Sequence, residues 1–148
     1  TILGHAARLL GSGGPLAGRR VVVTAGPTRE GLDPVRVVTN RSSGKMGFRL
    51  AEAAWERGAE VTLITGPVSL PAPVGVTLVT VETTEQMEAA VGAVLPGADV
   101  LIMAAAPADY RPAEAAAGKR PPTRRSTRRR PSSRSTRARS TCAGSSCT

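Results

Sequence analysis

Residues 39–47 are the part of this chain where phosphate chemistry is easiest to place. Their sequence, TNRSSGKMG, sets an Asn, an Arg, two Ser and a Lys around two Gly. An amphipathic helix is expected to begin inside this segment, and small hydroxyls with glycines at a helix start are a common phosphate-binding arrangement. The same Ser42, Ser43 and Gly44 can instead cap the helix, and Lys45 can instead be a solvated charge. Phosphate binding and simple capping both stand as interpretations.

A second group of polar residues comes just before this segment. Residues 26–43, GPTREGLDPVRVVTNRSS, are expected to form a long polar loop between a strand and the helix. Loops of this length are uncommon in compact domains unless they have a function. Arg36 and Asn40 can donate hydrogen bonds to a carbonyl or phosphate oxygen, and each is equally common as a turn residue or surface charge. The loop is interpreted as a candidate binding loop.

Two amphipathic segments are predicted to be the helices that position these residues. Residues 44–58 form the first, and Gly58 is suited to end it. Its expected buried face consists of Met46, Leu50, Ala51 and Ala54. Residues 83–95 form the second, opened by Thr83 and Gln86 at capping-box spacing. Its expected core stripe consists of Met87, Ala90, Val91 and Val94.

Four apolar runs rich in β-branched residues are predicted to be strands. They are residues 21–25, 59–65, 75–81 and 98–106. The order along the chain is strand, helix, strand, strand, helix, strand, and the runs are apolar enough to be covered on both faces. This order predicts an α/β fold, a Rossmann-like parallel sheet with helices on both faces. The sheet is expected to be incomplete, the first half of a doubly wound one.

Three loops are expected to meet beyond the carboxyl ends of these strands, where such sheets bind ligands. They carry AGPT at 25–28, SSGKMG at 42–47 and AAAPADY at 104–110. Asp109, at a strand end, is an ordinary site candidate, while the neighbouring Tyr110 is equally suited to be a core ring. The topology predicts a nucleotide site.

The positive charge of the chain is concentrated at one end. The net charge is +9, but ten Lys or Arg and no acid occur from Lys119 onward, whereas residues 1–118 hold ten bases and all eleven acids. Residues 120–148 contain no Leu, Ile, Val, Met, Phe, Tyr or Trp. They are expected to be disordered because they cannot bury enough apolar surface. A shifted reading frame and an arginine-rich RNA-binding tail are the two accounts of this composition.

The remaining bulk features favour a cytoplasmic protein without a disulfide framework. Cys142 and Cys147 both lie in the basic tail, and their spacing fits no zinc pattern. No apolar run approaches the roughly 20 residues of a membrane span, and no signal peptide opens the chain. Neither a membrane nor a specific nucleic acid is expected as a partner of the body.

A reductase using NADP is the simplest alternative for a Rossmann half. DVLIMAAAPADY, at 99–110, is similar to the fourth strand of short-chain dehydrogenases, but their Tyr-x-x-x-Lys pair is missing. Some eighteen residues separate the first strand from the first helix, where the glycine fingerprint needs only a few, and LITGPV lacks an acid for a ribose hydroxyl. A nicotinamide-dependent rate would favour this alternative. Salt-sensitive RNA binding that is lost on deleting 120–148 would instead favour an RNA-binding protein that acts through its tail.

Residues 21–71, VVVTAGPTREGLDPVRVVTNRSSGKMGFRLAEAAWERGAEVTLITGPVSLP, closely resemble phosphopantothenate–cysteine ligase. AAAPADYRP followed by a Lys resembles a second block of that family. In bacteria the ligase is one half of a bifunctional coenzyme A biosynthesis flavoprotein. The resemblance implies three regions: 1–18 as the end of an upstream decarboxylase domain and its linker, 19–119 as the N-terminal part of the ligase domain, and 120–148 as the disordered, frameshifted tail.

The resemblance implies CTP-dependent activation of 4′-phosphopantothenate to an acyl-cytidylate, which the amine of cysteine attacks. It implies that Asn40 and Arg36 act on this intermediate, which suits hydrogen-bond donors placed on developing charge. Lys119 is implied in catalysis and, with Asp109, in CTP binding. The expected cofactor-binding residues are Gly26, Pro27, Thr28, Ser42, Ser43, Gly44, Lys45, Met46, Ala105, Ala106, Asp109 and Lys119.

The same resemblance implies the cofactors and partners. CTP is the co-substrate, Mg²⁺ bridges its triphosphate without an assigned protein ligand, and FMN is expected only in the upstream domain. The family forms homo-oligomers, and the interface is expected to be incomplete here because the match stops after Lys119. For the same reason the chain as it stands is expected to have no appreciable ligase activity.

Overall fold

The computed structural model describes residues 2–10, 13–113 and 116–119. The basic segment at 120–148, and with it the expectation of disorder, lies outside the described residues. Across the described ranges, no helix has both the length and the apolar character needed to span a lipid bilayer.

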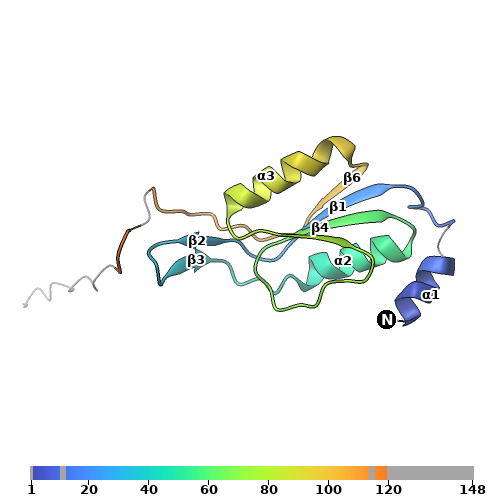
Figure 1. Ribbon diagram of the computed structural model, residues 1–148, viewed down its shortest axis with the longest axis horizontal. Coiled ribbons are helices and arrows are strands. Elements are labelled where there is room, and N and C mark those ends of the chain that lie inside the picture. The colour runs from blue at the N-terminus through green and yellow to red at the C-terminus, as the bar shows by residue number, and fades with distance from the viewer. Residues whose placement is uncertain (1, 11–12, 114–115, 120–148) are drawn as a thin grey trace, which may run out of the picture.

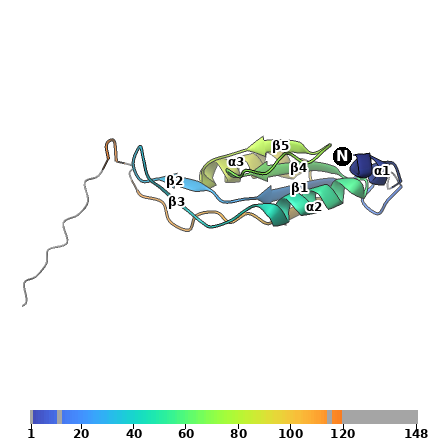
Figure 2. The same cartoon turned by 90° about the horizontal axis from the view of Figure 1, so that it is seen from below.

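Four parallel strands form the main sheet (Figure 1). β1 (Arg20–Ala25) pairs with β4 (Glu60–Thr65) on one side and with β6 (Val100–Met103) on the other. β5 (Thr77–Thr80) pairs with β4, so the spatial order is β5-β4-β1-β6. Helices lie on both faces of this sheet (Figure 2). The predicted α/β fold with a Rossmann-like parallel sheet is therefore confirmed.

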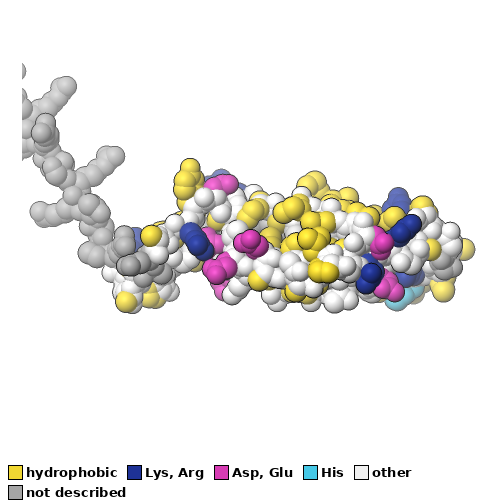
Figure 3. Space-filling model, turned by 90° about the horizontal axis from the view of Figure 1, so that it is seen from above, with side chains coloured by type: hydrophobic (Ala, Val, Ile, Leu, Met, Phe, Trp, Pro, Cys, Tyr) yellow, Lys and Arg dark blue, Asp and Glu magenta, His cyan; other side chains and the backbone are white. Residues whose placement is uncertain are grey.

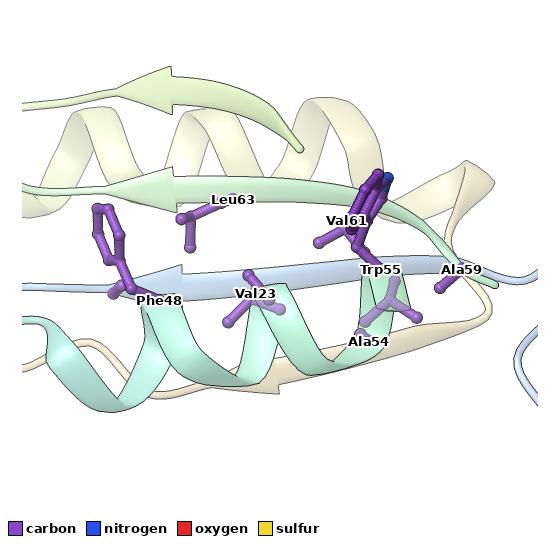
Figure 4. Close-up of a cluster of buried hydrophobic side chains, with 10 residues drawn as sticks. Val23, Phe48, Ala54, Trp55, Ala59, Val61 and Leu63 are labelled. Atoms are coloured by element: carbon purple, nitrogen blue, oxygen red, sulfur yellow. The ribbon is translucent and has the colours of Figure 1, made fainter. Parts of the chain in front are cut away.

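Helix α2 (Lys45–Glu56) covers one face of the sheet and forms the larger core (Figure 4). Gly47 lets it approach β1 closely, since a Cβ there would lie 2.5 Å from the Cβ of Ala25. The buried cluster on this side consists of Val21, Val23, Ala25, Phe48, Ala51, Ala54, Trp55, Ala59, Val61 and Leu63. Alternate residues of β1 point to this face because side chains alternate along a strand.

The expected buried face of this helix is only half right. Ala51 and Ala54 are buried, but Met46 is 66% exposed and Leu50 is 37% exposed. The contact of Gly47 with β1 sets the rotation of α2, so that the stripe facing the sheet runs through Phe48 and Trp55 instead. Gly58, at φ 103°, follows the C-cap residue Arg57, and its amide donates to Trp55 O as the expected helix end requires.

Helix α3 (Thr84–Val94) covers the opposite face and continues into the 3₁₀ turn η1 (Leu95–Gly97). The predicted capping box is confirmed: Gln86 N donates to Thr83 Oγ1 at 3.2 Å, and Thr83 N donates to Gln86 Oε1 at 3.3 Å. Met87 is the buried residue of α3 and lies against Val22 and Ile64. The rest of the predicted stripe is partly buried around it: Ala90, Val91 and Val94.

The long polar loop is not entirely irregular, and here the prediction is wrong. β2 (Arg29–Gly31) and β3 (Val37–Thr39) pair as an antiparallel hairpin that extends from the sheet (Figure 1). The hairpin turn is held by Asp33, whose Oδ1 accepts hydrogen bonds from Val35 N at 2.9 Å and Arg36 N at 2.8 Å. Strands of three residues are too short for the alternating pattern that identifies a strand in sequence.

Helix α1 (Ile2–Leu10) lies beside α2, at the other end of the molecule from the hairpin (Figure 1). The segment expected to be a linker lies along the domain as well, because Leu16 packs against the α2-side cluster and its amide donates to Arg57 O at 3.3 Å.

Candidate functional site

The loops that leave the carboxyl ends of the strands are joined to one another by backbone hydrogen bonds. Gly66 N donates to Ala25 O at 3.0 Å, which ties the loop after β4 to the end of β1. Ala106 N donates to Gly26 O at 2.8 Å, which ties the loop after β6 to the same strand. These bonds extend the parallel pairing beyond the sheet, so the backbone at the base of the predicted crevice is held by hydrogen bonds.

The start of α2 is pressed against the end of β1 at two glycines with positive φ. Gly26 has φ 73° and Gly44 has φ 72°, and a Cβ on Gly44 would lie 3.4 Å from Gly26 N. Val68, from the loop after β4, closes the gap, since a Cβ on either glycine would lie within 2.9 Å of its Cγ1. Backbone packing thus requires both glycines, and their predicted role in cofactor binding stays a prediction.

Ser42, Ser43 and Lys45 line one hollow at this helix start, and their role in phosphate binding stays a prediction. The hollow measures about 330 Å³ and is closed on its other side by residues 67–70. Ser42 Oγ accepts a hydrogen bond from Gly44 N at 3.3 Å, and the N-cap residue is Gly44 rather than a serine. The first amides of α2 have no carbonyl partner within the helix. The hollow therefore brings together the hydroxyls of the two serines, the ammonium of Lys45 and these backbone amides. Met46, on the same turn, is exposed.

Asn40 links the binding loop to the end of β6. Its Nδ2 donates to Pro107 O at 2.7 Å, which places it next to Ala105 and Ala106 in the loop after β6. Ala105 N in turn donates to Thr24 Oγ1 at 3.3 Å. Asn40 is half-buried, so an atom of a bound molecule can still reach it.

Thr28, predicted to contact the cofactor beside Pro27, lies inside the protein instead of on the crevice wall. It is fully buried, its Oγ1 accepts from Ala108 N at 2.8 Å, and its carbonyl accepts from Thr39 Oγ1 at 2.7 Å. Thr84 Oγ1 lies 2.9 Å from the same hydroxyl. Thr28 therefore joins the hairpin, α3 and the loop after β6, a connecting role that the sequence did not indicate.

Arg36 and Asn40 are not brought together. Arg36 Nε and Nη2 donate to Asp33 Oδ2 at 2.8 and 2.5 Å, in the turn of the hairpin. The strand β3 separates the two predicted residues, and four extended residues span roughly 13 Å. The carboxylate of Asp33 is fully buried and holds the arginine at the hairpin tip.

Asp109 and Lys119 are also placed apart from the serine-lined hollow. Asp109 lines a hollow of about 400 Å³ beside α3, with Glu30, Glu85 and Arg111 among its neighbours. Lys119 is exposed and follows Ala116, whose amide donates to Leu32 O at 3.1 Å next to the hairpin turn. Their predicted roles in CTP binding stay predictions.

A second, larger hollow is one that the sequence did not single out. It measures about 650 Å³ at the carboxyl ends of β4 and β5, with Phe48 and Leu78 on its walls. It adjoins the serine-lined hollow, because Pro67, Val68 and Leu70 line both. The signal that could have found it is the segment LITGPV, in which a buried strand ends in a Gly-Pro turn.

The described part of the chain offers no ligand set for a metal. Among residues 2–10, 13–113 and 116–119, no three His, Cys, Asp or Glu side chains are placed to hold an ion. The expected Mg²⁺ was assigned to the triphosphate without a protein ligand and stays a prediction, and no step below depends on it.

A parallel sheet with helices on both faces, whose strand-end loops meet at a helix start, defines a Rossmann-like α/β protein. Within that class, residues 16–128 match the family described as DNA/pantothenate metabolism flavoprotein C-terminal domain. This match covers more than half of the chain, and the chain belongs to that family.

Similar proteins carry a consistent name. The chain is 57% identical over 99 residues to "Coenzyme A biosynthesis bifunctional protein CoaBC" of Escherichia coli (strain K12), covering 67% of this chain and 24% of that protein. It is 54% identical over 105 residues to the protein of the same name from Mycobacterium tuberculosis (strain H37Rv), covering 70% and 25%. The chain thus spans about a quarter of the length of these relatives.

A solved structure supports the fold at similar identity. The crystal structure of the C-terminal domain of CoaBC aligns with a TM-score of 0.64 and 52% identity, covering 67% of this chain and 50% of that one. The elements described above therefore correspond to half of a known domain.

Proposed function

We propose that this chain carries the first half of a ligase domain that joins 4′-phosphopantothenate to cysteine in coenzyme A biosynthesis, with CTP as the activating nucleotide. Membership of the pantothenate-metabolism family and the names of the relatives support the pathway. The observation that carries the proposal is the hydrogen bond from Asn40 to Pro107 O, because it joins the binding loop to the loop after β6 beside the serine-lined hollow.

In the proposed reaction a carboxylate oxygen of 4′-phosphopantothenate attacks the α-phosphorus of CTP, and the bond to pyrophosphate breaks. The amine of cysteine then attacks the acyl carbon of the acyl-cytidylate and loses a proton. The amide forms, and CMP leaves with the electron pair of the anhydride bond. Both steps place charge on oxygens that need hydrogen-bond donors.

Asn40 is suited to donate to such an oxygen. A side-chain amide has two N–H donors, and one of them is used by Pro107 O. That bond fixes which way the amide faces and leaves the second N–H for an oxygen of the intermediate. Ser42, Ser43, Lys45 and the first amides of α2 would receive a phosphate in the adjoining hollow.

The proposal is tested in a chimera in which residues 19–119 of this chain replace the matched region of the E. coli relative. Asn40→Asp exchanges the donor for a carboxylate that repels both Pro107 O and an anionic intermediate. We expect turnover, measured as CMP and pyrophosphate release, to fall on the order of 10²-fold.

Glu60→Gln, at an exposed position at the amino end of β4, is the control and should leave turnover unchanged. Unchanged steady-state and single-turnover rates for Asn40→Asp would refute the proposed role of Asn40. A folded chimera that releases neither CMP nor pyrophosphate would refute the proposed function of the domain.

A further inference from the structure

The peptide unit between Pro107 and Ala108 is held by hydrogen bonds at both of its polar atoms. Its carbonyl oxygen accepts from Asn40 Nδ2 at 2.7 Å. Its amide nitrogen donates to Thr28 Oγ1 at 2.8 Å. A trans peptide is planar, with the C=O and the N–H pointing to opposite sides of the chain. The bond to Thr28 therefore sets the rotation of the same plane whose carbonyl orients Asn40.

The hydroxyl of Thr28 is a fixed end for this series of hydrogen bonds because water does not reach it. Thr28 has no exposed surface, and its hydroxyl lies 2.9 Å from Thr84 Oγ1 at the start of α3. Figure 3 shows the face that bears α3, where acidic and basic side chains gather toward the hairpin in contact with water. A polar group left without a partner away from water is unfavourable. The buried hydroxyl thus keeps the peptide plane in one orientation.

Thr28 also holds the segment that carries Asn40. Thr39 Oγ1 donates to the carbonyl oxygen of Thr28 at 2.7 Å. Thr39 is also paired across the hairpin with Arg29, the residue after Thr28. Asn40 is therefore one residue away from a group bonded to Thr28, and so is Pro107. A single buried residue connects the two partners of the hydrogen bond on which the proposed function depends.

We propose that Thr28 is a positioning residue for the ligase reaction, which directs the second N–H of Asn40 at the intermediate through the 107–108 peptide. The inference rests on the proposed function. It replaces the expected contact of Thr28 with the cofactor, since a side chain without exposed surface has nothing with which to touch a nucleotide. Asn40 is needed where charge develops. Loss of positioning should therefore slow the chemical steps and leave CTP binding unchanged.

Thr28→Val tests this role because it keeps the shape of the side chain and removes the hydroxyl. In the chimera described above, we expect kcat to fall about tenfold while the KM for CTP stays within about twofold of the parent value. Thr28→Ser restores the hydroxyl and should bring kcat back to within about twofold of the parent. Thr62→Val, the same change in the amino half of β4, is the matched control and should leave both constants unchanged.

A double variant separates positioning from a general structural effect. Asn40→Ala takes away the amide that Thr28 is proposed to position. Adding Thr28→Val to Asn40→Ala should therefore lower kcat by less than about twofold further. A full tenfold loss in the Asn40→Ala background would overturn the proposal, and so would a raised KM for CTP with unchanged kcat.

Hydrogen exchange in the chain alone tests the contact without relying on ligase activity. The bond to Thr28 predicts slow exchange at Ala108 N, and Thr28→Val should speed this exchange about tenfold, whereas Thr28→Ser should leave it within about twofold. Rapid exchange at Ala108 N in the parent chain would overturn the proposal, even if Thr28→Val does not fold. Slow exchange at Ala108 N in a chimera that releases neither CMP nor pyrophosphate would instead refute the proposed function, and with it the role of Thr28 in that reaction.

Discussion

The α2 face and the α3 face of the sheet bury apolar side chains to very different extents. Ten buried residues form the cluster under α2, including both Phe48 and Trp55, whereas three form the cluster under α3. The α2 face has a glycine that brings helix and strand into backbone contact, while α3 is held by its capping box and by partly exposed side chains. The close approach of α2 to β1, more than the length of the helix, therefore explains why the α2 face buries more apolar side chains than the α3 face.

The largest expected effect is the difference between two core deletions. Leu63→Ala removes a fully buried side chain from the α2 face and should cost about 3–5 kcal/mol of unfolding free energy. Met87→Ala, on the thinner α3 face, should cost about 2 kcal/mol because the surroundings can relax or admit water. Urea denaturation of both variants measures the difference. Equal losses would show that the two faces contribute alike.

Two glycine substitutions sharpen the same contrast. Gly47→Ala puts a Cβ within 2.5 Å of Ala25 Cβ and should cost about 1–3 kcal/mol by pushing α2 off the sheet. Gly92→Ala, on α3, meets nothing within 4 Å and should stabilise the protein by about 0.5–1 kcal/mol through helix propensity. Thermal melting of the pair measures both signs. A Gly47→Ala protein as stable as the parent would remove close approach as the cause of the difference.

The smallest expected effect lies at the amino end of the strands, between β1 and β6. Asp99 Oδ2 accepts from Arg20 N at 2.7 Å, and this hydrogen bond lowers the pKa of Asp99 below 3.8, with help from Arg19. A carboxyl with a lowered folded-state pKa contributes stability above pH 3.8 that is lost as the pH falls through that lowered pKa. Urea midpoints of Asp99→Asn should therefore fall less steeply than those of the parent between pH 5 and about 3. Parallel slopes for the two proteins would contradict this contribution.

The main sheet and its helices were predictable because their signals are local and repeated. Runs such as RRVVVTA and EVTLIT are apolar and β-branched, and Thr83 with Gln86 gives the start of α3 directly. The rotation of α2 was not predictable, because the contact of Gly47 with Ala25 is made between distant segments. The hairpin was not predicted for another reason. The buried carboxylate of Asp33 holds its turn, and in the sequence this residue looks like one polar loop residue among others.

The location of the candidate site was predictable, but the contacts among its residues were less so. Topology placed residues 42–47 and 104–110 at one end of the sheet, and Asn40 does join them. The sequence could not indicate that Arg36 is held by Asp33 at the hairpin tip, because this depends on the backbone of the hairpin. Nor could it show that Thr28 is buried, since a threonine after Gly-Pro looks like any surface turn residue.

The central place of β1 also has a consequence for folding kinetics. Val23 lies opposite Leu63 of β4 on one side and Ile102 of β6 on the other. One partner of β1 therefore precedes α3 in the chain, and the other follows it. Loop closure favours the nearer partner, so β1, α2 and β4 should form the early nucleus, and β6 should arrive last. The edge of β1 that awaits β6 is thus the surface on which a slow or stalled chain is most open to pairing with the wrong strand.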